Sequence, residues 1–554
     1  MSSRFIKGAM ILSISMVISR ILSLIYIIPF QRLVGSTGLA LYGYAYVPYT
    51  FLITLSTLGI PLGVAKFVAK YNADREYDTS RKIFRLGMIC MITLGILGFL
   101  IMWIGAPMFA RLALSGSEDA HNTIEDVIVV IRTVSFAVIV VPPIALLRGY
   151  FQGNQDMNPT AISQLVEQFV RVTLIVAGAF VVIHTFDGSI QTAVKVSVFA
   201  AFVAGVSALF VLRRYWVKKK HSFDTLLTQT IPHPHREPRD LIKELVSYAL
   251  PFALLSLVTT WFQVIDTMTF HSGIMRMSDS AVMGMGVEVM TSDLAQSIFG
   301  TYITALQKII MIPVSFAIAF SQPLVPDITE KVQLGNTRGV HKTLSSALML
   351  TSFVTLPAVV GMWLLSNPIY VMLFNEGEVM NQLGGSMFGV GAFVGIFMGM
   401  NAVMCAIMQG VNLQYKALLY LVVGSVIKLV GNLVLIPLLG GNGAVVSTMM
   451  AYAFCVVFNY LAIQKATGVA TKRIMRQHLS IFVFTALMAF SVWATTLILN
   501  RFIDYNASSI TAGAYVMITA IVGAAVYGGL SVYFGLVKVV LGARLASRFK
   551  RRQT

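Results

Sequence analysis

Ionisable residues inside long apolar runs are the most informative chemical feature of this sequence. Arg20 stands near the middle of residues 8–30, and Lys308 stands inside residues 294–321. A charged side chain at the centre of a bilayer costs at least about 2.5–3.5 kcal/mol on insertion scales, so it should face water or a partner. Neither cation has an acidic residue within four positions. The sequence therefore predicts a wet cavity in which Arg20 and Lys308 bind an anionic, phosphate-bearing ligand.

For Arg20 there is a structural alternative, in which the side chain snorkels to an interface or sits in a buried ion pair. Snorkelling is the weaker alternative because the charged group would have to reach about 15 Å from the middle of the run. Arg132 and Arg148 lie nearer the ends of their runs, and Arg148 is expected to reach the cytoplasmic headgroups.

The remaining intramembrane charges could serve coupling or structure. Glu167 precedes Arg171 by four residues, which places the two side chains on one helix face in the favourable order and predicts a structural ion pair. Lys428 and Asn432 are also four apart in one run, and Asp266 lies in another.

Composition identifies the elements that must position these residues. Of 554 residues, 57% are hydrophobic and 12% charged, whereas a soluble protein carries about 25% charged residues. Long apolar runs recur throughout the chain, so we expect an all-α polytopic membrane protein. We predict fourteen transmembrane helices, near residues 8–30, 40–65, 86–110, 125–150, 160–184, 190–212, 244–269, 294–321, 343–365, 384–408, 416–438, 443–464, 479–499 and 512–537.

Lys and Arg gather in alternate connections between these runs, notably residues 66–85, 213–243, 465–476 and the C-terminal tail. The positive-inside rule then places both termini in the cytoplasm, which requires an even number of helices, as fourteen is. The net charge of +18 is therefore assigned to topology and to contact with anionic lipids, and not to nucleic acid.

An internal repeat divides the chain. Pro48, Pro61 and Lys66 have the same spacing as Pro313, Pro326 and Lys331. A second match relates Gln152-Gly153 and Arg171 to Gln409-Gly410 and Lys428. We therefore predict six-helix lobes at residues 1–213 and 241–465, a basic cytoplasmic linker at 214–240, and two additional helices with a basic tail at 466–554. Duplicated bundles of this kind are a transporter architecture, with a substrate site between them.

No catalytic motif accompanies these features. The sequence lacks a Walker loop, HExxH and GxSxG, and its three cysteines lie inside apolar runs without metal-ligand spacing. We expect no enzyme activity, no bound metal and no cofactor. The first run contains Arg20 and lacks a small-residue cleavage site, so we interpret it as a retained span.

Three segments resemble a known family: SRILSLIYIIPFQRLVG, GIPLGVAKFVAKYN and RGYFQGNQDMNPTAISQLVEQFVRV. They resemble the MOP-superfamily flippases, and most closely the MurJ (YtgP-type) family of Gram-positive bacteria, over essentially the whole chain. The resemblance implies a flippase that moves the undecaprenyl-pyrophosphate-linked peptidoglycan precursor, lipid II, from the inner to the outer leaflet by alternating access.

The same resemblance implies how the substrate is held. In the family, a V-shaped cationic cavity between the lobes binds the pyrophosphate and sugar, and the last two helices help to form a groove for the polyprenyl tail. Arg20 falls on the family's first-helix arginine, and Lys308 falls where its eighth-helix arginine stands. Both are therefore expected to bind substrate.

The sequence also departs from the family. Other cavity arginines of Gram-negative members fall on Tyr26 and Leu52. A relative's sodium site uses acidic and amide side chains on the seventh and eleventh helices, where this chain has Lys428 with Asn432. We predict that Lys428 pairs with Asp266 and replaces the ion, which makes sodium coupling doubtful. Coupling to the membrane potential or to another ion stays open.

Alternative functions are a flippase for another lipid-linked polysaccharide intermediate, a drug or cation antiporter, a membrane enzyme that handles polyprenyl substrates, and a structural scaffold. Unpaired cations disfavour the antiporter, short external loops disfavour the enzyme, and a scaffold explains neither the cations nor the repeat. We expect a monomer that could contact the cell-wall synthesis machinery.

Overall fold

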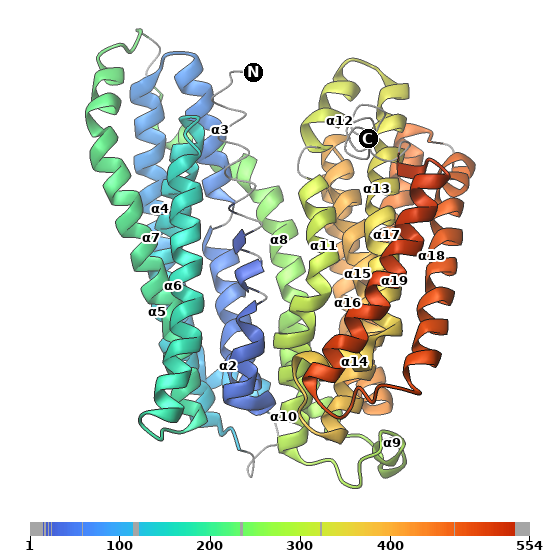
Figure 1. Cartoon of the computed structure of the whole chain (residues 1–554). Helices are drawn as coiled ribbons and strands as arrows, with labels where there is room; N and C mark the ends of the chain where they lie inside the picture. The colour runs from blue at the N-terminus through green and yellow to red at the C-terminus, as the bar shows by residue number, and fades with distance from the viewer. Residues whose placement is uncertain are drawn as a thin grey trace, which may run out of the picture. The chain divides into compact units, whose positions relative to one another are not determined.

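The computed structural model describes residues 15, 18–19, 21–23, 25–57, 59–114, 121–232, 236–321, 324–469 and 471–537. The regular elements in these ranges are all helices (Figure 1). Contacts between them divide the chain into two units, Met1–Ser272 and Gly273–Thr554, with the division close to the end of α8. The predicted lobe and linker boundaries stay a prediction.

Unit 1 consists of long helices joined by short turns. They are α2 (Ile27–Thr57), α3 (Ile60–Ala73), α4 (Tyr77–Ala113), α5 (Ile124–Gly153), α6 (Asn158–His184), α7 (Ile190–Leu227) and most of α8 (Pro238–Ile274). Central α5 packs against α2, α3, α4 and α7, while α6 packs mainly along α7.

Unit 2 contains the shorter helices α9 (Asp279–Gly284), α10 (Ser292–Gly300), α12 (Leu324–Gln333) and α14 (Ser366–Leu373), with a π-helix, η1 (Thr301–Leu306), between α10 and α11. The longer helices are α11 (Gln307–Ser321), α13 (Thr337–Leu364), α15 (Glu378–Gly410), α16 (Gln414–Leu439), α17 (Gly441–Thr467), α18 (Thr471–Leu499) and α19 (Ser509–Tyr533). The last two pack against each other and against α13 and α14.

Thirteen helical stretches in the described part of the chain are long and apolar enough to cross a membrane. The first, Ile21–Ala73, has 53 residues, which as one continuous helix would measure ~80 Å, more than twice the hydrocarbon thickness of a bilayer. It includes the second predicted span and the end of the first. The protein is thus a multi-pass, all-helical membrane protein, as the composition predicts.

Two glycines interrupt this first stretch. Gly35 has a φ of 66° inside α2, between the predicted spans 8–30 and 40–65. Gly59 has a φ of 67° and separates α2 from α3, so the predicted span 40–65 is not one helix. Positive φ costs residues with a Cβ atom about 1–2 kcal/mol, which explains why glycine occupies both breaks.

The internal repeat predicted from the sequence is visible in local structure. Pro48 lies inside α2 and Pro61 at the second position of α3; Pro313 lies inside α11, and Pro326 is the third residue of α12. Each unit therefore has an apolar helix with an internal proline, and the next helix along the chain is shorter and carries a proline in its first turn.

The second sequence match also corresponds to matching structures. α5 ends at Gly153 and α15 ends at Gly410, and both close with the same turn. Two residues later, Gln155 and Asn412 have φ values of 58° and 60°, and their backbone N–H groups donate to the carbonyls three residues earlier. The two units thus repeat the same helix ending at the predicted positions.

α7 is longer than the sequence predicts. It continues to Leu227, well beyond the predicted end at residue 212 and into the predicted linker. The extension is held because Trp216 and Phe223 pack against Phe84, Tyr150 and Phe151, with ring centroids 5.2–6.3 Å apart.

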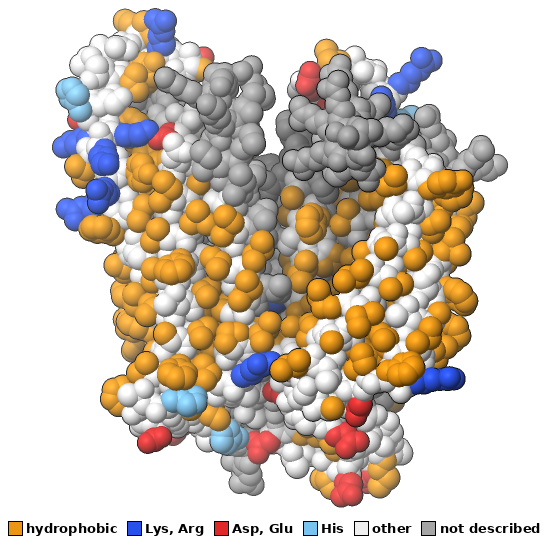
Figure 2. Space-filling model, viewed as in Figure 1, with side chains coloured by type: hydrophobic (Ala, Val, Ile, Leu, Met, Phe, Trp, Pro, Cys, Tyr) orange, Lys and Arg blue, Asp and Glu red, His pale blue; other side chains and the backbone are white. Residues whose placement is uncertain are grey.

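Figure 2 shows hydrophobic side chains over the middle of each unit and Lys and Arg side chains gathered at one end of unit 1.

Candidate functional site

Arg20, the first predicted substrate ligand, lies outside the described residues. Its described neighbours Ser19 and Ser23 are linked, since the Ser23 hydroxyl donates to the Ser19 carbonyl at 2.7 Å. Gln168 of α6 donates through Nε2 to the same Ser23 hydroxyl at 2.9 Å. This segment of the first span therefore lies beside α6, the helix that also carries Glu167 and Arg171.

Glu167 forms two ion pairs inside unit 1. One carboxylate oxygen accepts from Arg171 at 2.8 Å, which is the pair predicted from the four-residue spacing. The other oxygen accepts from Arg148 of α5, also at 2.8 Å. The side chains are only 15–18% exposed.

The prediction that Arg148 snorkels to the headgroups is wrong. Its Nε donates to Ser163 at 2.9 Å while its other nitrogen binds Glu167, so the guanidinium is held between α5 and α6. The short turn between these helices brings residues 15 and 19 positions apart side by side. A buried carboxylate offers stronger hydrogen bonds than water at the interface, which explains the inward orientation.

Tyrosines from α2 lie near Arg171. The rings of Tyr42 and Tyr46 stack at 5.2 Å, and Tyr46 and Tyr49 lie 5.2 Å apart with tilted planes. The phenols of Tyr46 and Tyr49 are close enough to Arg171 to interact with its charge. Arg148, Glu167 and Arg171 together carry one net positive charge, in a setting of hydroxyl groups.

In unit 2, Lys308 is the second residue of α11 and lies two residues after the end of the π-helix. Its side chain is half-buried. All six residues of η1 are buried, and one of them, Tyr302, is joined through its hydroxyl to Thr448 of α17 at 3.2 Å. π-turns are frequent at functional sites, and this one fixes the approach of the chain to Lys308.

Lys428 is linked by a hydrogen bond to Thr448, the same residue that Tyr302 contacts. It is fully buried in α16 and donates to the Thr448 hydroxyl, which is also bound to Tyr302. Four residues on, Asn432 accepts from Ser447 of α17. A hydroxyl- and amide-lined site of this kind can hold a cation, here the lysine ammonium itself.

Asp266 is buried in α8, at 1% exposure. Its pairing with Lys428 stays a prediction. Tyr302, Ser447 and Thr448 were not singled out from the sequence, because neutral hydroxyl residues are common in membrane helices. No sequence signal marks them, because their contacts depend on how α16, α17 and η1 pack together.

The described residues contain no group of three or more His, Cys, Asp or Glu side chains that could hold a metal ion. What the two units do offer is guanidinium and ammonium groups embedded among hydroxyls within apolar helices. Such groups bind oxyanions by charge-assisted hydrogen bonds.

Comparison with known proteins identifies relatives of the same architecture. Residues 5–332 match the family model described as "Polysaccharide biosynthesis protein". The lipid II flippase MurJ of Bacillus subtilis (strain 168) is 36% identical over 551 residues, which cover all of this chain and 99% of that protein.

Solved structures agree on the fold. A lipid II flippase MurJ in an inward closed conformation superposes with a TM-score of 0.67 at 15% identity, covering 95% of this chain and 98% of that one. An inward-facing multidrug resistance MATE family transporter of the MOP superfamily gives 0.63, covering 81% of this chain and 96% of that one. Both likenesses concern the fold, and both neighbours are helical membrane transporters.

Proposed function

Because the chain belongs to the family of the lipid II flippase MurJ, we propose that it is itself a lipid II flippase, a transporter and not an enzyme. The observation that carries the proposal is the full-length match, which leaves no part of the chain outside the relative. The substrate is the lipid-linked peptidoglycan precursor, carried from the inner to the outer leaflet. A flippase for another lipid-linked intermediate and a polyprenyl-handling enzyme are not favoured by this match.

Charge supports an anionic substrate. Unit 2 places Lys308 half-buried within an apolar helix, and the triad of Arg148, Glu167 and Arg171 in unit 1 carries one net positive charge. A pyrophosphate offers two or more negative charges to such groups. We assign substrate binding to Arg20 and Lys308, with both termini in the cytoplasm.

Coupling is assigned to the protein's own charges rather than to sodium. The ammonium group of Lys428 is buried and donates to the Thr448 hydroxyl, and Asn432 and Ser447 are hydrogen-bonded to each other across the same two helices. A permanent cation there removes the need for a dissociable one. Flipping should therefore proceed equally well when sodium is replaced by potassium.

The function is tested in a strain depleted of its own lipid II flippase. Expression of this chain should restore growth and move lipid II to the outer leaflet, where an added external enzyme or lipid II-binding peptide detects it. Growth without exposed lipid II, or no rescue by a chain that reaches the membrane, would overturn the proposal.

The site is tested separately with matched lysine variants. Lys308→Ala should abolish rescue at unchanged membrane abundance, whereas Lys416→Ala, at an exposed position near the start of α16, should rescue fully. Arg20→Lys should retain partial activity because it keeps the charge but loses the bidentate fork, and Arg20→Ala should be inactive. Full rescue by Lys308→Ala or Arg20→Ala would remove that residue from the mechanism and leave the proposed function intact.

A further inference from the structure

Methionine is concentrated in the connection between α8 and α10. Five of the sixteen residues 275–290 are methionine, against 29 in the whole chain of 554, and they form two Met-x-Met pairs followed by a fifth: Met275, Met277, Met283, Met285 and Met290. The connection lies outside the candidate spans Ala253–Ile274 and Ser292–Ala319. It also lies outside the substrate and coupling residues described above.

Three thioethers from this connection and from α15 meet at the turn between α16 and α17. Gly440 has a φ of 59°, and a Cβ atom built on it would lie 2.7 Å from Sδ of Met285 and 3.5 Å from Cε of Met277. A Cβ atom on Gly441 would overlap Sδ of Met387. Two consecutive residues without side chains therefore leave room for three methionine side chains.

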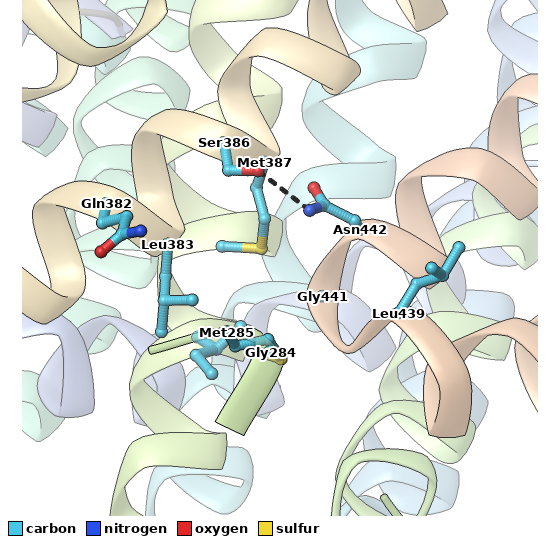
Figure 3. A pocket seen from close by; sticks show the side chains of 10 residues that line it. Gly284, Met285, Gln382, Leu383, Ser386, Met387, Leu439, Gly441 and Asn442 are labelled. Carbon is cyan, nitrogen blue, oxygen red and sulfur yellow. Dashed lines mark hydrogen bonds between the residues drawn. The ribbon is translucent and has the colours of Figure 1, made fainter. Parts of the chain in front are cut away.

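Two of these methionines border a cavity (Figure 3). The cavity has a volume of about 150 Å³, and Met285 and Met387 lie on its walls together with Asn442. Asn442 donates through Nδ2 to the Ser386 hydroxyl at 3.0 Å, while its Oδ1 atom is buried without a hydrogen-bond partner. The cavity is partly open to solvent, so a small ligand can reach the two methionines and the unsatisfied acceptor.

Packing is the competing explanation, since methionine adapts to irregular gaps. It accounts poorly for this segment. The side chains of Met277 and Met285 are only half-buried, and the cavity beside Met285 and Met387 is partly open to solvent. The thioethers of half-buried Met277 and Met285 and of buried Met387 in α15 are arranged around a glycine turn, which suits them to coordination.

We propose that Met277, Met285 and Met387 form a binding site for a soft monovalent cation, Cu(I) or its analogue Ag(I). Uncharged thioether sulfur is a soft ligand that selects Cu(I) over the hard cations Na⁺, Mg²⁺ and Ca²⁺, which require oxygen ligands. The flexible methionine side chains can rotate to complete the coordination, and the two glycines allow the sulfurs to approach the turn. Metal binding would tie the α8–α10 connection to the α16–α17 turn and to α15.

The test is calorimetric titration of the purified full-length protein with Ag(I) in a chloride-free buffer, and with Cu(I) under anaerobic conditions. Wild-type protein should bind one ion saturably at this site. Met285→Leu and Met387→Leu, which keep the apolar volume but remove the sulfur, should each weaken binding at least tenfold. The matched control Met283→Leu changes an exposed methionine of the same connection and should bind within twofold of wild type.

Equal binding by wild type, Met285→Leu and Met387→Leu would overturn the proposal and leave packing as the explanation. The three cysteines are unchanged in every variant, so any binding to them cancels in the comparison. A second readout needs no variant: Ag(I) should protect Met277, Met285 and Met387 of the wild-type protein from peroxide oxidation, measured by mass spectrometry, and leave Met283 unprotected. Uniform oxidation of all four with the metal present would also overturn it.

Discussion

Replacing Glu167 by glutamine should be more damaging than removing either of its arginine partners. In the structure one carboxylate neutralises charge on both Arg148 and Arg171, at 2.8 Å each. Glu167→Gln keeps the shape but leaves two guanidinium groups without a carboxylate. Breaking a buried ion pair costs about 3–5 kcal/mol, and side chains that are 15–18% exposed favour the lower end, about 3 kcal/mol. That corresponds to roughly a hundredfold shift in the folding equilibrium.

Removal of one arginine has a smaller cost. Arg171→Met leaves Glu167 paired with Arg148, so charge balance improves locally from one net positive charge to none, and only one ion pair is lost. The expected order of stability is wild type, then Arg171→Met, then Glu167→Gln. Thermal unfolding of the purified proteins, followed by tryptophan fluorescence, measures the order, and membrane abundance provides an independent check. A Glu167→Gln protein that is as stable as Arg171→Met would refute the view that one carboxylate serves both arginines.

Two further predictions concern the contact of α3 with α8. Burial disfavours ionisation of Glu244, but hydrogen bonds from Tyr71 and Lys70 outweigh it and hold the pKa of Glu244 below its usual value. Its contribution to stability is therefore fully present above about pH 4.3, the usual glutamate pKa, and is lost as the pH falls through the lower folded pKa. Glu244→Gln should flatten the acid side of the stability–pH profile; an unchanged profile would contradict this. Gly59→Ala should destabilise by more than the ~1–2 kcal/mol expected of positive φ alone, because its Cβ would lie 2.8 Å from a carbonyl oxygen of α8. Gly335→Ala is the control, since Gly335 has a φ of 64° with open space around it, and equal losses for the two variants would show that the close approach is unimportant.

Apolar length and internal repetition were the features that could be predicted best from the sequence. Hydrophobic runs locate membrane helices because the bilayer requires an unbroken apolar surface and internal backbone hydrogen bonding. The repeated prolines succeeded for a local reason: a residue without an N–H group belongs at a helix start, as at Pro61. The four-residue spacing of Glu167 and Arg171 succeeded for the same kind of reason, since helix geometry alone brings them together.

Features that depend on contacts between helices were not predicted. Arg148 reaches Glu167 only because the turn after α5 sets the register of two neighbouring helices, and spacing along one helix carries no such information. The extension of α7 to Leu227 depends on aromatic packing of Trp216 against other helices, which overrides the polar composition of that stretch. Likewise, the pairing of Lys428 with Thr448 requires the relative rotation of α16 and α17.

The π-helix before Lys308 changes which face of the helix each later residue occupies in a helical-wheel projection. A regular α-helix rotates by about 100° per residue, whereas a π-turn accommodates an extra residue in its wider loop. A face of α10 that is assigned from sequence spacing therefore does not continue onto α11 beyond Thr301–Leu306. A helical wheel drawn through residues 292–321 assigns Lys308 to the wrong face of the helix. Deleting one residue from this turn would let a regular α-helix present Lys308 on the face that it occupies now, without shortening either apolar run. The direction in which this positive charge faces is thus set by how one turn accommodates its extra residue, and not by spacing along the sequence alone.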